Sequence, residues 1–134
     1  MILLDTHIWV WWVNESNQLS RQIIDIVASN LEDGLGVSII SCWEVAKLVE
    51  YGRLQLAFPV EQWLYSALNY PGINLLDLTP KIVVESTQLP GAFHKDPADQ
   101  LIVATARVHN CLLLTADAKI MAYEHVKTLA STPD

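Results

Sequence analysis

The chain has 134 residues, 51% hydrophobic and 17% charged, which predicts one folded domain and excludes intrinsic disorder. Its net charge of −7 (8 Lys+Arg, 15 Asp+Glu) argues against a broad nucleic-acid-binding surface and favours a basic partner or acids gathered around divalent cations. Cys42 and Cys111 are too few for a disulfide scaffold, and the longest strongly apolar run, Ile8–Val13, is far shorter than the roughly 20 residues that span a membrane.

The first half of the chain alternates apolar runs with helical patterns. Residues 1–5 are an apolar run ending on Asp5, which predicts a buried strand. Because Asp5 interrupts this run and no basic segment precedes it, we expect no secretory signal and a cytoplasmic protein. The next predicted elements are a helix over 6–13, a helix capped by Ser20 and running to Leu31, a strand over 35–40, a helix from Ser41 to Gly52, and a helix from Pro59 to Leu68.

The second half repeats the alternation. Thr79 and Pro80 are the predicted N-cap and first residue of a helix that reaches about Leu89. The other predicted elements are strands over 73–78, 111–115 and 126–129 and helices over 97–109 and 117–123. Strands that alternate with helices predict an α/β fold, a three-layer α/β/α sandwich with a mostly parallel central sheet. We expect a single domain over 1–130 and a short tail over 131–134.

Five acids lie just after predicted strands or at the start of predicted helices. Asp5 directly follows the first strand, Asp117 follows the fourth, and Glu44 lies in the first turn of the helix after the second strand. Asp96 and Asp99 begin the helix that leads into the fourth strand. Since sites in open α/β sheets form beyond the carboxyl ends of strands, all five are expected near one edge. Clustered carboxylates repel one another unless cations bind, and such hard oxygen ligands select Mg²⁺ or Mn²⁺.

Each acid also has an ordinary structural role open to it. Asp5, Asp96 and Asp117 are placed to cap helix N-termini, a role worth about 0.5–2 kcal/mol. Glu44 is placed to pair with Lys47 at i+3 on a solvated helix face. The joint position of the acids at one sheet edge favours a shared site over separate structural roles.

Four segments of the chain carry a family resemblance: Ile2–His7, Val37–Glu44, His94–Asp99 with Leu101–Ala106, and Leu113–Asp117. In order and spacing they resemble the PIN domain, specifically the small toxin ribonucleases of the VapC type found in bacterial toxin–antitoxin pairs. The resemblance covers almost the whole chain. It implies that Asp5, Glu44, Asp99 and Asp117 form an acidic quartet that holds Mg²⁺ or Mn²⁺. Asp96 corresponds to an extra acid that would bind metal directly or through water.

The resemblance implies a Mg²⁺- or Mn²⁺-dependent endoribonuclease that acts as the toxin of a type II pair. Its expected partners are an RNA substrate, a cognate antitoxin that inhibits it, and a second copy of the chain. Asp5 would be the central ligand, Asp99 and Asp117 would complete the cage, and Glu44 would ligate or orient the attacking water. Thr6 and Thr115 are candidates to hydrogen-bond the carboxylates or a bound phosphate, or are ordinary cap and strand residues.

One departure from the family pattern concerns how substrate is held. The subgroup often has an aromatic residue and an arginine around the second acid, where this chain has Ala98 and Gln100. Local phosphate contacts would have to come from the few cations, of which Lys95, beside Asp96, is the leading candidate; the others are Lys47, Arg53, Arg107 and Lys119.

Several other residues have both a structural and a functional interpretation. His7 and His94 lie in the motif segments and are candidates to line the cleft. Trp9 and Trp12 are expected to fill the core, or to form an exposed stripe that receives an antitoxin helix or a second subunit. Two alternative functions stay open. One is a catalytically silent PIN-like module that binds RNA or protein; the other is a phosphatase, although that chemistry needs an acid where His7 stands.

Overall fold

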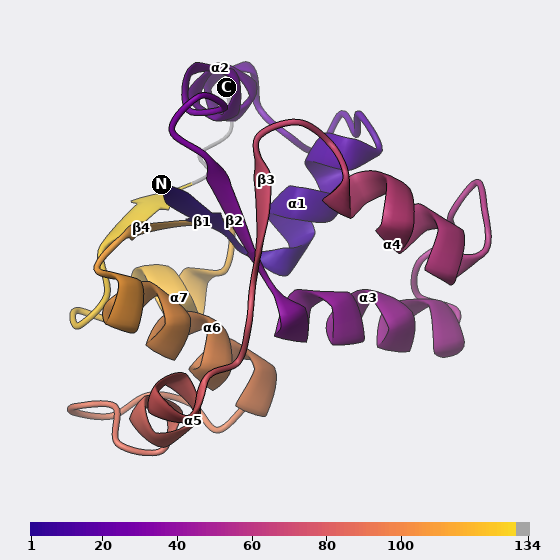
Figure 1. The fold of residues 1–134 in the computed structure, drawn as a ribbon. Helices are drawn as coiled ribbons and strands as arrows, with labels where there is room; N and C mark the ends of the chain where they lie inside the picture. Colours follow the sequence, from indigo (N-terminus) through magenta and orange to yellow (C-terminus); the bar gives the residue numbers. More distant parts are fainter. Residues whose placement is uncertain (131–134) are drawn as a thin grey trace.

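The computed structural model describes residues 1–130, so the predicted tail at 131–134 lies outside the described residues. Strands and helices alternate along most of the chain (Figure 1). The elements are β1 (Ile2–Leu4), α1 (Thr6–Val13), α2 (Arg21–Ser29), β2 (Leu35–Ser38), α3 (Ile39–Glu50), α4 (Val60–Leu68), β3 (Ile73–Leu76), α5 (Pro80–Ser86), α6 (Pro97–His109), β4 (Leu112–Thr115), α7 (Ala118–Met121) and β5 (Thr128–Ala130). None of the described helices has the length and apolar character needed to span a membrane.

All pairings in the five-stranded sheet are parallel, with strand order β3-β2-β1-β4-β5. The register places Leu3 of the central strand opposite Gly36 of β2 on one side and Leu113 of β4 on the other. The predicted α/β fold with helices around a parallel sheet is therefore confirmed. Because the strands are parallel, their carboxyl ends lie at the same edge of the sheet.

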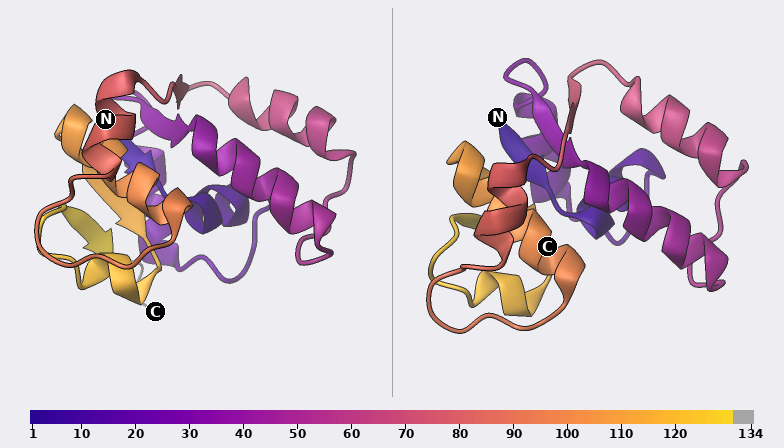
Figure 2. Two further views of the ribbon diagram at one scale, coloured as in Figure 1. Left: turned by 90° about the horizontal axis from the view of Figure 1, so that it is seen from below. Right: turned by 60° about the horizontal axis from the view of Figure 1, so that its bottom comes forward.

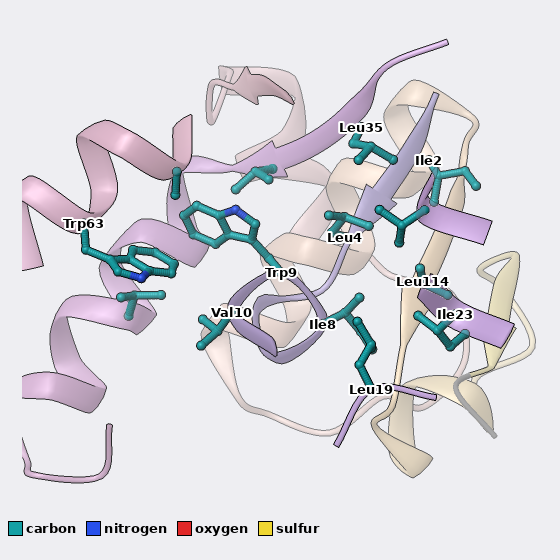
Figure 3. Packing of buried hydrophobic residues seen from close by; sticks show 14 residues of the cluster. Ile2, Leu4, Ile8, Trp9, Val10, Leu19, Ile23, Leu35, Trp63 and Leu114 are labelled. Carbon is teal, nitrogen blue, oxygen red and sulfur yellow. The ribbon is translucent and has the colours of Figure 1, made fainter. Parts of the chain in front are cut away.

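The core consists of two hydrophobic clusters, because alternate side chains of a strand point to opposite faces. Leu4 and Leu114 pack in the first cluster with Trp9 of α1, while Leu3 and Leu113 pack in the second with Ile102 of α6. Figure 3 shows the first cluster, where the Trp9 ring meets the Trp63 ring of α4 edge-on at 5.1 Å between centroids. Every strand at the centre of the sheet is thus buried on both faces, as its apolar sequence requires.

Trp9 is fully buried, so its expected membership of the core is confirmed and an exposed stripe through it is excluded. Trp12 is half-buried and meets Tyr70 edge-on at 5.0 Å between centroids. The two indoles differ because Trp9 faces the sheet and Trp12, three residues further along a short helix, reaches its margin.

The boundary between the second strand and the following helix differs from the predicted one. The strand ends at Ser38 rather than at residue 40, and α3 begins at Ile39 rather than at Ser41. The physical reason is that Ser38 is the N-cap, since its Oγ accepts a hydrogen bond from the N–H of Ile40 at 3.1 Å. Glu44 consequently lies in the second turn of α3, and the prediction of its first turn was wrong.

Three helices end earlier than predicted: α2 at Ser29 rather than Leu31, α5 at Ser86 and α7 at Met121. In α5 the hydroxyls of Ser86 and Thr87 donate to the carbonyls three residues before them, at 2.6 and 2.7 Å, which competes with continued helix formation. After α7, Tyr123 turns into the second cluster and its hydroxyl donates to the carbonyl of Pro90 at 2.5 Å. Smaller corrections concern β1, which ends at Leu4, β3, which ends at Leu76, and β5, which covers Thr128–Ala130.

Helices α5 and α6 lie side by side, and α3 and α4 extend together away from the sheet (Figure 2). The loop between α5 and α6 runs past α7 in both views of Figure 2. This arrangement brings residues near 93 and residues near 123 together at the end of the molecule that carries the acids.

Candidate functional site

The candidate site lies at the carboxyl edge of the sheet, where strand order changes direction between β1 and β4. In open α/β sheets ligands bind at such a switch point. Asp5 directly follows β1, and its N–H donates to the carbonyl of Leu114 in β4 at 2.9 Å. Thr115 ends β4, and Asp117 is the N-cap of α7. The topology therefore brings residues more than 100 positions apart in sequence to one place.

Asp5 is buried and held by two hydrogen bonds. Its Oδ1 accepts from the N–H of Thr6 at 2.8 Å, and its Oδ2 accepts from the hydroxyl of Thr115 at 2.6 Å. Burial raises the pKa of Asp5 above its ordinary value, a rise that these hydrogen bonds and His7 partly oppose and that Asp117 adds to. Asp5 thus has a fixed orientation at a position where an unpaired negative charge is unfavourable.

Glu44 is fixed by a hydroxyl contact from α1. Thr6 Oγ1 lies 2.5 Å from Glu44 Oε1 and 2.8 Å from Ser41 Oγ, and its single proton serves only one of the two contacts. Burial, followed by the charges of Asp5 and Asp96, raises the pKa of Glu44 to about 7 although the Thr6 contact lowers it. The alternative pairing of Glu44 with Lys47 is wrong, since Lys47 Nζ pairs with Glu50 Oε1 at 2.9 Å.

The pKa of Asp99 is affected by all four of the other predicted acids. Burial and the charges of the other four acids raise its pKa to about 7; in order of size after burial these charges are Asp96, Asp5, Asp117 and Glu44. Because a charge shifts a neighbour's pKa mainly over short distances, these shifts indicate that the five predicted acids lie near one another. Every charge that shifts the pKa of Asp99 is negative, so the site repels further anions and attracts cations.

Asp96 and Asp117 cap helices, and the structural role predicted for them is confirmed. Asp96 Oδ1 accepts from the N–H groups of Ala98 and Asp99 at 2.9 and 3.2 Å. Asp117 Oδ1 accepts from Lys119 and Ile120 at 2.8 and 3.2 Å. Among residues 1–130 neither Oδ2 takes part in a hydrogen bond, so each cap leaves one oxygen for another role.

The chemistry of these donors fits a hard divalent cation, because the site offers carboxylate oxygens and several mutually repelling negative charges. Within the described part of the chain, however, no three Asp, Glu, His or Cys side chains converge closely enough to hold an ion. Ligation therefore requires the carboxylates to approach one another more closely than they do here. A bound cation would offset the repulsion between the like charges that this approach brings together.

The two candidate histidines have different surroundings. His7 is exposed, and its ring lies 5.8 Å from that of Trp11. His94 Nε2 lies 3.1 Å from Asp99 Oδ2, but within residues 1–130 it has no well-aligned hydrogen-bond partner, so this contact is electrostatic. His94 is placed in the cleft, beside the acids.

Few of the candidate cations are available near the acids. Lys47 forms an ion pair with Glu50. Arg107 pairs with Glu85 at 3.5 Å and donates a hydrogen bond to the carbonyl of His125 at 2.6 Å. Lys95 and Lys119 are exposed and adjoin Asp96 and the α7 cap respectively.

The sequence analysis missed two residues that support the site. Ser41 is buried against Thr6, and Gln100 Nε2 donates to the carbonyl of His94 at 3.1 Å, which fixes the loop before α6. The spacing of Ser41 and Glu44 is a signal for the first, since residues at i and i+3 share a helix face. Gln100 had been noted only as a departure from the family pattern.

A second feature is an apolar groove between α1 and α4, on a different part of the molecule. Its volume is about 540 Å³, and its aromatic lining consists of Trp11, Trp12, Phe58, Trp63 and Tyr70. Large apolar hollows of this kind mark interaction sites. We call this feature the aromatic groove.

Comparison with known proteins agrees with the fold. Residues 2–126 match the family model described as the PIN domain, and the chain belongs to the PIN-domain family. It is 36% identical over 124 residues, covering 92% of each chain, to a protein of Mycobacterium tuberculosis named Ribonuclease VapC22. This similarity confirms the predicted resemblance to the VapC type.

Solved structures of similar fold include a toxin–antitoxin complex from Klebsiella pneumoniae, with a TM-score of 0.66, 20% identity and 100% of both chains covered. A second is VapBC2 from Rickettsia felis bound to a promoter DNA fragment, with a TM-score of 0.70, 19% identity, and 97% of this chain and 98% of that chain covered. Another is FitAcB from Neisseria gonorrhoeae, with a TM-score of 0.70, 21% identity and 98% of both chains covered. At these identities the likeness shows the fold.

Proposed function

We propose that this protein is a Mg²⁺- or Mn²⁺-dependent endoribonuclease, the toxin of a type II toxin–antitoxin pair. The observation that carries the proposal is the gathering of acids at the carboxyl edge of the sheet, at the N-termini of α1, α6 and α7 and on α3. Burial and the other four carboxylates there raise the pKa of Asp99 to about 7. Such a cluster is costly in a folded protein unless it serves a cation or a reaction. Its relative in Mycobacterium tuberculosis is named a ribonuclease.

In this proposal Asp5, Glu44, Asp99 and Asp117 hold the metal, and Asp96 holds it directly or through water. A bound divalent cation would lower the pKa of a water molecule and neutralise charge on the phosphate. Thr115 and the N–H of Thr6 fix the orientation of Asp5. Thr6 also holds Glu44, which would ligate the cation or orient the attacking water.

The test is cleavage of single-stranded RNA with Mg²⁺ or Mn²⁺, in the presence and absence of EDTA. We expect wild-type cleavage that EDTA stops. Asp5→Asn should lower the rate at least about 100-fold, because the substitution removes the buried ligand charge but keeps an oxygen to cap α1. The matched control is Asp25→Asn, since Asp25 only pairs with Arg21 on the surface.

Full activity of Asp5→Asn, or cleavage that persists in EDTA, would contradict the proposal. If wild type binds RNA or protein without cutting RNA, the silent PIN-like module is the better description. Phosphate release from small esters would instead favour the phosphatase, for which the exposed His7 occupies the place of the required second acid.

For the partner, we propose that a helix of the cognate antitoxin occupies the aromatic groove. The groove is apolar, the chain has a net charge of −7 that favours a basic partner, and a similar fold occurs in a toxin–antitoxin complex.

The homodimer and the cytoplasmic location stay predictions; sedimentation velocity tests the first and cell fractionation the second.

The groove is tested with Phe58→Glu, which places a charge on its lining. Phe58 is 49% exposed, so the change should leave the fold intact and weaken binding of the co-expressed antitoxin at least about tenfold. Tyr65→Glu is the control, because Tyr65 is 73% exposed and lies outside the groove lining. Equal antitoxin affinity of wild type and Phe58→Glu by calorimetry would exclude the groove.

A further inference from the structure

An open pocket lies beside the acidic cluster, between the loop before α6 and the segment after α7. Its volume is about 430 Å³, within the range of about 300–1,000 Å³ of small-ligand sites. Its lining includes four ring-bearing residues, Phe93, His94, Tyr123 and His125, and one cation, Lys119. We call it the aromatic pocket; it is distinct from the aromatic groove on α1 and α4.

The rings of the aromatic pocket form a continuous row. The centroid distances are 4.5 Å from His94 to Phe93, 4.7 Å from Phe93 to Tyr123 and 5.4 Å from Tyr123 to His125. Hydrogen bonds hold three members of the row: Tyr123 donates to Pro90, Gln100 donates to the carbonyl of His94, and Arg107 donates to the carbonyl of His125. The Tyr123 ring and the backbone of His94 and His125 are therefore fixed before any ligand binds, which lowers the entropic cost of binding.

The pocket is joined to the acidic cluster at two points. His94 lies 3.1 Å from Asp99 and lines the pocket at the same time. Lys119 lines its other side, and the N–H of Lys119 donates to Asp117 at 2.8 Å. A molecule in the pocket would thus be adjacent to two of the proposed metal ligands.

One part of the pocket is suited to a phosphate group, because Lys119 lines it. Lys119 is exposed, and no ion pair engages it among residues 1–130. Glu124 also lines the pocket, and its carboxylate is 3.3 Å from His125 Nε2. A phosphate is therefore expected beside Lys119, and the half-buried rings of Phe93, His94 and His125 are available to an uncharged planar group.

We propose that the aromatic pocket binds one base of single-stranded RNA next to the cleaved phosphate, while Lys119 contacts a neighbouring phosphate. The inference rests on the proposed function and specifies how the RNA is held. Proteins recognise single-stranded RNA by stacking its unpaired bases on aromatic and histidine side chains and by pairing its phosphates with lysines.

The test measures RNA affinity of Phe93→Leu in an Asp5→Asn background, which keeps the RNA intact. Leucine retains apolar packing but removes the flat ring, so we expect affinity to fall about tenfold at a temperature at which both proteins are folded. Tyr65→Leu removes an exposed ring elsewhere and is the matched control. Lys119→Ala should lower the salt dependence of binding by about one phosphate contact.

A second measurement separates base stacking from an indirect structural effect. Once wild type has been used to map a cut site, abasic nucleotides are placed in turn beside it. At one position the abasic RNA should bind about tenfold more weakly when Phe93 is present and equally well in Phe93→Leu. Equal losses for both proteins at all positions would overturn the pocket as a base subsite.

The failures of the two proposals are distinguishable. Unchanged RNA affinity of Phe93→Leu, with wild type still cutting RNA, overturns the pocket and leaves the nuclease standing. RNA binding that depends on Phe93, by a wild type that does not cut RNA, supports the pocket as an RNA-binding site and overturns the nuclease.

Discussion

At the residue scale, Glu44 and Asp99 determine how the site responds to pH. Burial and neighbouring carboxylates raise both pKa values to about 7, from ordinary values of 4.5 and 3.8. The folded protein therefore binds protons more tightly than the unfolded chain between about pH 4 and pH 7. Protonated Glu44 and Asp99 contribute stability that is fully present below their unfolded pKa values and is lost as pH rises through 7.

We predict that the free energy of unfolding of the metal-free protein falls as pH rises from 5 to 8. Urea unfolding in EDTA at several pH values measures this slope. Saturating Mg²⁺ should flatten it, because the cation binds the ionised carboxylates of the folded state and offsets their repulsion. An Asp99→Asn variant should have a smaller slope than wild type. A slope that is zero in EDTA, or unaffected by Asp99→Asn, would contradict this prediction.

Two other residue-scale features could not be obtained from sequence patterns. The contact of Thr6 with Glu44 joins residues 38 positions apart, and that of Thr115 with Asp5 joins residues 110 positions apart. The sequence predicted hydroxyls near carboxylates, but which hydroxyl serves which carboxylate depends on how α1, α3 and β4 meet.

At the element scale, the acids that cap helices have two roles with different chemical requirements. A cap needs an oxygen that accepts hydrogen bonds from N–H groups, which asparagine supplies as well as aspartate. A metal ligand needs the negative charge. Substitutions of Asp96, the N-cap of α6, can separate the capping role from the metal-binding role, because only its Oδ1 forms the cap.

We predict that Asp96→Ala lowers the free energy of unfolding by about 1 kcal/mol, whereas Asp96→Asn changes it by less than about 0.5 kcal/mol. Both variants should weaken Mn²⁺ binding, since both remove the charge. Chemical unfolding gives the first quantity and calorimetry the second. If Asp96→Asn binds Mn²⁺ as wild type does, Asp96 is a structural cap only.

Element boundaries show where local sequence signals were sufficient. Thr79 and Ser20 act as N-caps as predicted, because a cap depends only on residues two or three positions away. The start of α3 was misplaced since two serines compete as caps: Ser38 forms the capping bond, and Ser41 is used instead for a contact with Thr6.

At the scale of the whole molecule, stability depends on the first hydrophobic cluster, with Trp9 at its centre. The ring is fully buried against Trp63, yet within the described residues its Nε1 has no hydrogen-bond partner. A buried donor without a partner lowers stability by about 1–3 kcal/mol, so the indole is not the optimal side chain for this position.

We predict that Trp9→Ala destabilises the protein by about 3–5 kcal/mol, a large share of the about 5–15 kcal/mol typical of a domain. Trp9→Phe should cost less than about 1.5 kcal/mol, because losing the unpaired donor offsets part of the lost volume. Urea unfolding at fixed pH compares the two. A loss as large for phenylalanine as for alanine would mean that the Nε1 group has a partner, such as a buried water.

The sequence by itself determined the class of fold and the set of acids. Apolar runs and helix signals act over a few residues, so they locate parallel strands and the acids that follow them. Only the tertiary structure decided the burial that moves the pKa values of Glu44 and Asp99, the buried place of Trp9, and the row of rings from His94 to His125. These properties depend on distances between segments far apart in the chain, and packing of the whole domain sets those distances.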